Sequence, residues 1–474
     1  MSLNLEHKKV LVVGLGVTGL SMARWLDARG AVVAVADSRD HPPHAARLQA
    51  ELPGVPLFTG KLRAEVFRNA DLLAVSPGVS LREPAVADSL AHGVEVVGDI
   101  ELFAQALRTQ DLELRTRVIA ITGSNGKSTV TEMVGAMCKK AGLHTIVAGN
   151  IGLPVLDALS DLDRRGETAD VFVIELSSFQ LETTFSLHPA AATVLNVTED
   201  HMDRYAGMED YAVAKERIFA GNGVQVLNRE DRYSLAMAKP GRRLMTFGLD
   251  APQKPEDWGL LGGSGFSLIS TAEAVPTLWL AQGENRLMPL ADLPLAGLHN
   301  AANALAALAL CRAIDLPLQP LIEALREFKG LPHRVEKVTE INGINFYDDS
   351  KGTNVGATVA ALNGMPGKVV LIAGGDGKGQ DFSPLAPAVS AHARAVVLIG
   401  RDGPQIGAAL AGCGVPVLSA ASMEEAVILG FEQARPGDAV LLSPACASFD
   451  MFRNYEHRAQ VFIAAVKKLE EAEA

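Results

Sequence analysis

The sequence predicts an α/β protein of three domains, each built on a mainly parallel sheet. Its 474 residues correspond to about three domains of ordinary size. Short apolar runs alternate along the chain with helical patterns, as in parallel strands joined by crossover helices. Most of these runs end at Gly, Ser, Thr or Pro, at the sheet edge where such folds bind ligands. We expect domains over residues 1–115, 116–331 and 332–474.

The first domain begins with a dinucleotide-binding, Rossmann-like pattern. A strand over 10–13 leads into a Gly-x-Gly-x-x-Gly turn from Gly14 to Gly19, then a helix and a second strand over 31–36 that ends at Asp37. Such a turn, with an acidic residue about 20 positions on, places a pyrophosphate at a helix N-terminus. Because similar turns also bind other diphosphates or only pack a helix, a nicotinamide-dependent oxidoreductase stays open as an alternative.

The rest of the first domain supplies one more loop and a connection. A strand over 71–75 ends at Ser76-Pro77-Gly78, which should lie at the same sheet edge as the first turn. The charged stretch 111–117 lacks an apolar pattern, so we expect it to link or cap the first domain.

The second domain opens on the most informative stretch of the chain. Residues 118–129 read Val-Ile-Ala-Ile-Thr-Gly-Ser-Asn-Gly-Lys-Ser-Thr, a buried strand, a glycine-rich turn and a helix start. Glycines let successive N–H groups face one anion at the helix N-terminus, Lys127 can reach β- and γ-phosphates, and a following hydroxyl can bind Mg²⁺. The spacing is tighter than in the common phosphate loop, because Ile121 stands where the first glycine would fall. The pattern predicts a nucleoside triphosphate site at Gly123, Ser124, Asn125, Gly126, Lys127, Ser128 and Thr129.

Residues at two later strand ends are candidate metal ligands. Glu175 follows an apolar strand over 171–174, where a charge without a partner would be costly, and Mg²⁺ would be such a partner. His201 follows a strand over 192–197, and both a hydrogen-bonded loop histidine and a metal ligand stay open there. Lys215 looks like one more surface lysine on a short helix.

The remainder of the second domain carries fewer signals. A helix over 300–314 has Asn300 and Asn303 on its first turn. The region 229–295 mixes Gly, Pro and short β-like runs, and we assign it no chemistry.

The third domain repeats the alternation of strands and helices and ends in a long helix. Polar loops follow three of its predicted strands, at 348–354, 374–378 and 443–449. Lysines and hydroxyls at the ends of adjacent strands would suit a substrate that carries carboxylates.

Composition limits the partners. The net charge of −12 disfavours nonspecific binding to nucleic acid or an anionic membrane. Four widely spaced cysteines form no C-x-x-C pair, as expected for a reducing compartment without disulfides or a thiolate metal site. No apolar run is long enough for a signal peptide or a bilayer span. We expect a cytoplasmic monomer without nucleic-acid or membrane partners.

Together the motifs resemble the Mur ligase family over essentially the whole chain. The phosphate loop and Asp349-Ser-Lys351 are also shared with folylpolyglutamate synthetases, whereas 199–205 and 443–448 are similar to the D-glutamate-adding member. In chain order, the stretches that carry the resemblance are 122–129, 149–152, 175–182, 196–205, 299–300, 331–334, 349–351, 374–378 and 443–448.

The resemblance implies a reaction and its cofactors. An ATP-dependent ligase of peptidoglycan precursor synthesis would join D-glutamate to UDP-N-acetylmuramoyl-L-alanine through an acyl phosphate, releasing ADP and phosphate. Lys127 would hold the β- and γ-phosphates, with Ser128 and Glu175 at a first Mg²⁺. His201 would ligate a second Mg²⁺, together with Lys215 carbamylated by CO₂. Lys127, His201 and Lys215 would thus be the catalytic residues.

The resemblance also implies the binding residues. Asn300, Asn303, Arg334 and Asp349 would contact the nucleotide, and Lys351, Thr353, Lys378, Ser448 and Phe449 the D-glutamate carboxylates. The first domain would bind UDP through Leu15, Val17, Thr18, Asp37, Ser38 and Arg39, and the nucleotide-sugar site would include Ser76, Gly78 and Asn150. Alternatives are a sibling ligase for another amino acid, a folylpolyglutamate synthetase, the oxidoreductase, and a nucleotide-gated binding protein without turnover.

Overall fold

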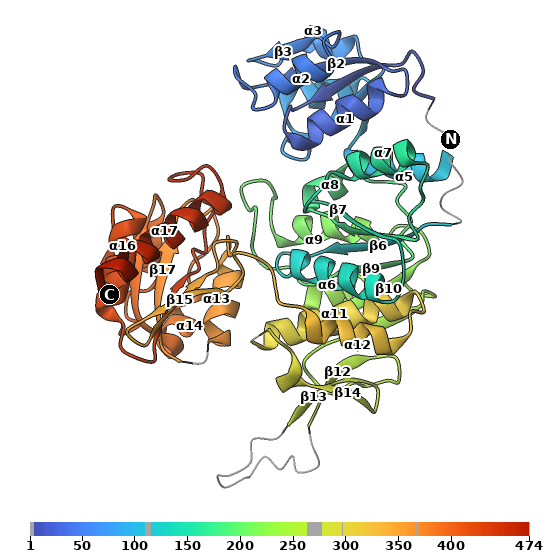
Figure 1. Cartoon of the computed structure of the whole chain (residues 1–474). Coiled ribbons are helices and arrows are strands. Elements are labelled where there is room, and N and C mark those ends of the chain that lie inside the picture. The colour runs from blue at the N-terminus through green and yellow to red at the C-terminus, as the bar shows by residue number, and fades with distance from the viewer. Residues whose placement is uncertain (1–3, 110–114, 263–276, 296, 366, 474) are drawn as a thin grey trace.

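The computed structural model describes residues 4–109, 115–262, 277–295, 297–365 and 367–473. Within these ranges the chain forms three separate sheets, each flanked by helices, as Figure 1 shows. The expected linker at 111–117 lies mostly outside the described residues, and the predicted domain limits remain predictions.

The N-terminal sheet has the strand order β3-β2-β1-β4-β5 with every pairing parallel. The apolar runs of β1 and β4 are buried, which favours a sheet covered on both faces. Its strands are β1 (Lys9–Val13), β2 (Val32–Asp37), β3 (Leu57–Thr59), β4 (Leu72–Val75) and β5 (Glu95–Val97). Its helices are α1 (Val17–Asp27), α2 (Ala45–Glu51), α3 (Ala64–Arg68) and α4 (Pro84–Ala91).

Helix α5 (Asp99–Thr109) follows β5 but packs on the central domain, against α7 (Val155–Arg165) and α8 (Ser178–Glu182). Its Phe103 ring lies 4.9 Å from that of Phe172 in the central sheet. The first and second domains therefore share one apolar core across their boundary.

The central sheet has the order β14-β13-β12-β11-β10-β9-β6-β8-β7, parallel from β7 to β12 and antiparallel beyond. The unassigned region 229–295 thus supplies strands that extend the sheet, apart from 263–276, which lie outside the described residues. The strands are β6 (Arg117–Thr122), β7 (Thr145–Gly149), β8 (Val171–Glu175), β9 (Ala191–Val194), β10 (Val224–Asn228), β11 (Leu244–Phe247), β12 (Trp258–Gly262), β13 (Leu278–Gln282) and β14 (Asn285–Pro289).

The helix α11 (Leu298–Ala313) packs on α6 (Lys127–Lys140) and on the strands β9 to β12. Its run of Ala and Leu makes it apolar nearly all round, which fits its deep burial. The other central helices are α9 (Met208–Glu216), α10 (Arg232–Ala236) and α12 (Leu318–Glu327), with 3₁₀ turns at Arg217–Phe219 and Leu290–Asp292.

The strand predicted over 192–197 ends earlier, at Val194. Asn196 turns toward the phosphate loop instead, where its side-chain oxygen accepts the Asn125 N–H at 2.8 Å and its amide donates to the Asn125 carbonyl at 3.1 Å. The strand therefore ends before Asn196, because the side chain of Asn196 pairs with the phosphate loop.

The C-terminal sheet has the order β15-β16-β20-β17-β18-β19, parallel except for the β15–β16 hairpin at its edge. Its strands are β15 (Glu336–Ile341), β16 (Ile344–Asp348), β17 (Val369–Gly374), β18 (Ala393–Ile399), β19 (Val417–Ser419) and β20 (Ala439–Leu442). Its helices are α13 (Val355–Gly364), α14 (Leu385–His392), α15 (Gly403–Ala409), α16 (Met423–Gln433) and α17 (Tyr455–Glu473).

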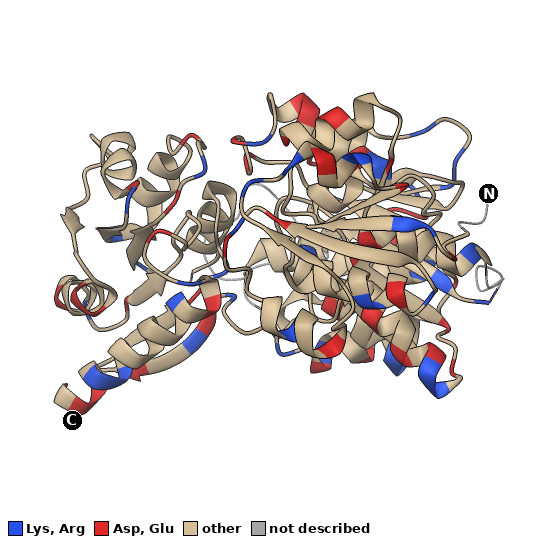
Figure 2. Ribbon diagram, turned by 90° about the horizontal axis from the view of Figure 1, so that it is seen from above, with Lys and Arg blue, Asp and Glu red and all other residues tan. Residues whose placement is uncertain are grey.

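Charged side chains of both signs are spread over the ribbon in Figure 2 rather than gathered on one element. Across the described ranges, no helix combines the length and the apolar character needed to cross a bilayer.

Candidate active site

The phosphate loop connects β6 to α6 and is held from two sides. Gly126 is the N-cap of α6 with a φ of 83°, a conformation that glycine adopts without steric cost. The Lys127 ammonium folds back onto the carbonyls of Gly123 and Ser124, at 2.9 Å each. Burial lowers the pKa of Lys127, while Glu175 and Asp200 oppose that shift. The loop is formed, and its lysine is held against two carbonyls of the loop itself.

We expect Gly126→Ala to weaken nucleotide binding. An added Cβ would stand 2.5 Å from the Asn303 Oδ1, and the left-handed backbone would cost about 1–2 kcal/mol. Gly142→Ala is the matched control, because its φ of 87° carries the same backbone strain but nothing lies within 4 Å of its Cβ. Urea denaturation should show both variants destabilised, whereas the KM for ATP should rise in Gly126→Ala alone. An equal rise in both would contradict the steric argument.

The residues around Glu175 fit a cation. Glu175 ends β8, is 2% exposed, and accepts the Asn150 amide at 2.8 Å on Oε1. Its Oε2 is buried without a hydrogen-bond partner among the described residues. Since a buried carboxylate oxygen is normally paired, this oxygen and the Ser128 hydroxyl at the start of α6 suit the oxygen ligands that Mg²⁺ prefers.

Lys215 lies on α9 beneath the phosphate loop, not on the surface. It is 1% exposed, and its ammonium donates to the Gly123 carbonyl at 3.0 Å and sits 4.4 Å from the Tyr211 ring centroid. Burial, reinforced by the Lys127 charge, lowers the pKa of Lys215 well below its ordinary value. The interpretation of Lys215 as a surface lysine is therefore wrong.

His201 lies in a tight turn after β9 with a φ of 59°. Its Nε2 is 3.5 Å from an Asp200 carboxylate oxygen, and its ring centroid is 4.6 Å from that of Phe179. Burial lowers the pKa of His201 to about 4, which leaves a neutral imidazole near pH 7. A neutral imidazole has the lone pair that a metal ligand requires.

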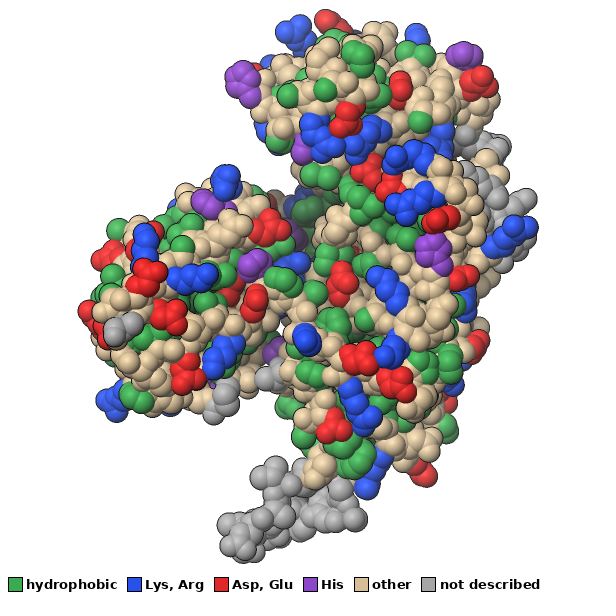
Figure 3. Space-filling view, viewed as in Figure 1, with side chains coloured by type: hydrophobic (Ala, Val, Ile, Leu, Met, Phe, Trp, Pro, Cys, Tyr) green, Lys and Arg blue, Asp and Glu red, His purple; other side chains and the backbone are tan. Residues whose placement is uncertain are grey.

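A cavity of about 290 Å³ opens beside the phosphate loop, between α11 and the C-terminal domain. It brings together most of the predicted nucleotide residues, namely Asn125, Gly126, Thr129, Asn300, Asn303, Arg334 and Asp349. An Arg334 guanidinium nitrogen lies 3.5 Å from the Ser128 hydroxyl, so the linker to the third domain reaches the start of α6. In Figure 3 the surface is hollowed between the C-terminal domain and the other two.

The buried carboxyl of Asp349, which lines this cavity, makes the stability of the folded protein depend on pH. Burial raises the pKa of its carboxyl to about 7, although the Ser443 hydroxyl donates to it at 2.7 Å. The folded state then binds the proton more tightly than the unfolded chain, so stability is lost as the pH rises from about 4 to about 7.

We therefore expect Asp349→Asn to be more stable than the parent protein at pH 8 and equal to it at pH 4. The difference in urea midpoints should grow between these values and level off above pH 7. The same variant should lose nucleotide affinity if Asp349 contacts the nucleotide. A midpoint difference that is constant with pH would contradict this assignment.

A second cleft, of about 630 Å³, lies between the N-terminal and central domains. Most predicted UDP residues line it, namely Val17, Thr18, Asp37, Ser38, Arg39, Ser76, Gly78 and Asn150. Leu15 does not, because its side chain is fully buried and its N–H donates to Asp37 at 2.6 Å. Asn150 lines this cleft and also bonds Glu175, so the cleft leads to the candidate metal position.

The loops predicted to hold an acidic substrate follow β16, β17 and β20, which are neighbours in the sheet, so the prediction of one shared edge is confirmed. Lys378 forms an ion pair across the domain boundary with Asp200. Burial lowers the pKa of Lys351 to about 8. Ser448 is buried, whereas Phe449 is 74% exposed and Thr353 is half-buried.

Two residues near the phosphate loop were not predicted as site residues. Asn354 caps α13 of the third domain and donates to the Asn125 side chain at 2.9 Å. Asp200 is 6% exposed and pairs with Lys378. Asp200 is adjacent to His201 in the sequence motif. Which of the acidic residues near His201 points inward depends on the conformation of the turn, which the sequence does not show.

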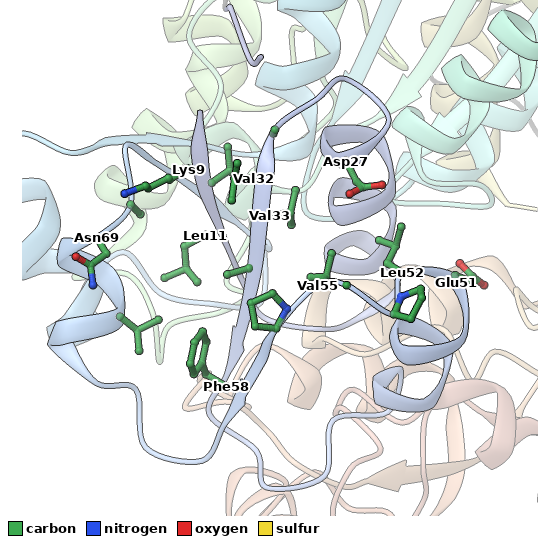
Figure 4. A pocket seen from close by; sticks show the side chains of 18 of the residues that line it. Lys9, Leu11, Asp27, Val32, Val33, Glu51, Leu52, Val55, Phe58 and Asn69 are labelled. Carbon is green, nitrogen blue, oxygen red and sulfur yellow. The ribbon is translucent and has the colours of Figure 1, made fainter. Parts of the chain in front are cut away.

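A larger groove of about 740 Å³ lies on the N-terminal sheet, shown in Figure 4. Its floor is mostly aliphatic, with Leu11, Val32 and Val33 from the strands and Phe58 at one side. None of the predicted site residues lines it.

Comparison with known proteins decides the family. A UDP-N-acetylmuramoylalanine–D-glutamate ligase from Thiobacillus denitrificans is 59% identical over 478 aligned residues, which cover 99% of this chain and 98% of that protein. A protein of the same name from Methylobacillus flagellatus is 57% identical, with 99% of both chains covered. The chain belongs to the Mur ligase family.

Models of Mur ligase domains match consecutive parts of the chain. The MurD-like N-terminal domain matches residues 8–98, the Mur ligase middle domain 121–311, and the Mur ligase glutamate ligase domain 333–446. The resemblance to the family is therefore confirmed.

Solved structures share the fold of this Mur ligase. A UDP-N-acetylmuramate-alanine ligase from Thermotoga maritima aligns with a TM-score of 0.61 at 20% identity, covering 98% of this chain and all of that chain. MurF from Acinetobacter baumannii aligns with a TM-score of 0.60 at 18% identity, covering 98% and 91%. The predicted three-domain α/β architecture is confirmed.

Proposed function

We propose that this Mur ligase uses ATP to join the carboxylate of UDP-N-acetylmuramoyl-L-alanine to the amine of D-glutamate, in peptidoglycan precursor synthesis. The observation that carries the proposal is the position of Glu175. It accepts a hydrogen bond from Asn150 of the 630 Å³ cleft, and its charge acts on Lys127 of the phosphate loop, which borders the 290 Å³ cavity. Relatives more than half identical over nearly the whole chain carry the name of this ligase.

The chemistry needs a leaving group and charge neutralisation. A carboxylate oxygen of the nucleotide sugar attacks the γ-phosphorus, ADP departs, and the amine then attacks the acyl carbon and releases phosphate. Each partner is an anion, so cations must hold the two together in line. Lys127 of the central domain and Lys351 and Lys378 of the third domain supply positive charge to one region, since the charge of Lys378 acts on Lys127 and that of Lys127 acts on Lys351.

The proposal includes two Mg²⁺ ions. Ser128 and Glu175 would hold the first, and His201 and a carbamylated Lys215 the second. Bound there, the ions would neutralise phosphate charge and polarise the transferred group. The Glu175 oxygen without a partner among the described residues, the neutral His201 and the downward shift of the Lys215 pKa support these roles.

We assign the substrate-binding roles from the clefts and loops in which the residues lie. The UDP-substrate residues other than Leu15 surround the 630 Å³ cleft, and the loops with Lys351, Thr353, Lys378, Ser448 and Phe449 would face the D-glutamate carboxylates. We also propose a cytoplasmic monomer, on the strength of the unpaired cysteines and the net charge of −12. Sedimentation velocity at working concentration tests the oligomeric state.

The deciding experiment is phosphate release from ATP with Mg²⁺ and UDP-N-acetylmuramoyl-L-alanine, with D-glutamate, L-glutamate or neither added. Release that depends on D-glutamate alone, with the dipeptide product identified by mass, supports the proposal. Release with L-glutamate instead would favour a sibling ligase or a folylpolyglutamate synthetase. NADH oxidation without phosphate release would favour the oxidoreductase.

A further inference from the structure

The turn that carries His201 continues directly into Arg204. The N–H groups of Arg204 and Tyr205 both donate to the His201 carbonyl, at 2.9 and 3.3 Å. These two bonds tie the Arg204 backbone to that of His201. Arg204 and the turn form one local unit.

The Arg204 side chain is anchored within the central domain. Its guanidinium donates to a Glu182 carboxylate oxygen at 2.7 Å, and its carbon lies 4.1 Å from the Phe179 ring centroid. Glu182 also accepts the Tyr205 hydroxyl at 2.7 Å. The Phe179 ring lies beside His201 as well, at 4.6 Å between centroids. With a side chain only 14% exposed, the guanidinium is fixed from several directions.

The same guanidinium crosses the domain boundary. It donates to the carbonyls of Pro77 and Val79, at 3.2 and 3.3 Å, in the loop after β4 of the N-terminal domain. That loop, residues 76–80, lines the cleft assigned above to the nucleotide sugar. Arg82 from the same domain returns a bond to the Arg204 carbonyl at 3.3 Å.

We infer that Arg204 is a positioning residue that couples the loop 76–80 of the nucleotide-sugar cleft to the His201 turn. The identity of the ligand in that cleft rests on the proposed function. The substrate would be held at its UDP end by one domain while its carboxylate reacts in another. The distance between the two domains then sets the alignment of the reacting carboxylate. An arginine suits this task because its planar fork presents several N–H donors at fixed angles, whereas a lysine presents a single point charge.

The test compares Arg204→Met and Arg204→Lys with Arg24→Met. Arg24 lies at the same domain boundary and pairs with Asp157 at 2.7 Å, but it does not contact the His201 turn. For Arg204→Met we expect kcat/KM for the nucleotide sugar to fall about 100-fold, the size expected for a misalignment of about 1 Å. The KM for ATP should not change. Arg204→Lys should recover part of the loss, and Arg24→Met should behave as the parent protein.

Hydrogen–deuterium exchange supplies a readout that does not depend on the reaction. In Arg204→Met the amides of residues 78–80 and 202–205 should exchange faster together, while Arg24→Met leaves both segments unchanged. Unchanged exchange in Arg204→Met would overturn the coupling whichever reaction the protein catalyses. The coupling would also be overturned if Arg204→Met lost no more kcat/KM for the nucleotide sugar than Arg24→Met, or if its KM for ATP rose by the same factor. If the parent protein ignores D-glutamate, the proposed function fails while the exchange result still decides the coupling.

Discussion

Replacing Lys215 by alanine is expected to lower kcat by about 10²–10³-fold, the effect of removing one preorganised charged group from a reaction centre. The side chain is buried under the phosphate loop, and burial with the Lys127 charge lowers its pKa. A larger share of the amine is then neutral at pH 7, which is the form that attacks CO₂. The resulting carbamate would exchange an unfavourable buried cation for an anion beside Lys127.

A pair of variants at this position separates the carbamate from other roles. Lys215→Ala leaves space in which acetate or bicarbonate could replace the missing anion, whereas Lys215→Met fills that space. We expect both to lose activity and only Lys215→Ala to be partly rescued by added acetate or bicarbonate. Lys239→Ala, which removes a lysine 3.9 Å from Glu216 on the outside of α9, is the control for general effects. Full activity of Lys215→Ala without rescue would exclude the carbamate.

The second large effect is expected for Glu175→Gln. The exchange keeps the shape of the side chain and its contact with Asn150, but it removes the charge of the buried oxygen that has no partner among the described residues. Activity should fall about 100-fold or more, and the Mg²⁺ concentration for half-maximal rate should rise. Glu167→Gln, at an exposed glutamate, should change neither quantity.

Thermal unfolding tests the same ion without catalysis. A ligand that binds only the folded state stabilises it by about 2.7 kcal/mol at 100 times its Kd. The parent protein and Glu167→Gln should therefore gain in Tm when Mg²⁺ and ADP are added together rather than ADP alone. In Glu175→Gln this additional gain should disappear. A gain equal to that of the parent protein would show that Glu175 does not hold the ion.

Much of the fold could be predicted because apolar strands and glycine-rich turns are local signals. The phosphate loop, the strand before it and the start of α6 at Lys127 appeared where the pattern indicated. The three polar loops of the third domain did fall on one sheet edge. The local pattern did not capture packing. It extended β9 past Val194. It also placed Lys215 on the surface, because the sequence of a short polar helix does not show which of its side chains are buried.

The sequence by itself determined the α/β type of each domain and the place of the glycine-rich loop before α6, because these depend on spacing within a few residues. Only the tertiary structure decided that Lys215 is buried beneath the Gly123 carbonyl, that Asn354 reaches the phosphate loop, and that Arg204 spans two domains. Each of these contacts joins residues far apart in the chain. Such contacts form only when the sheets and helices pack, and no local pattern records them.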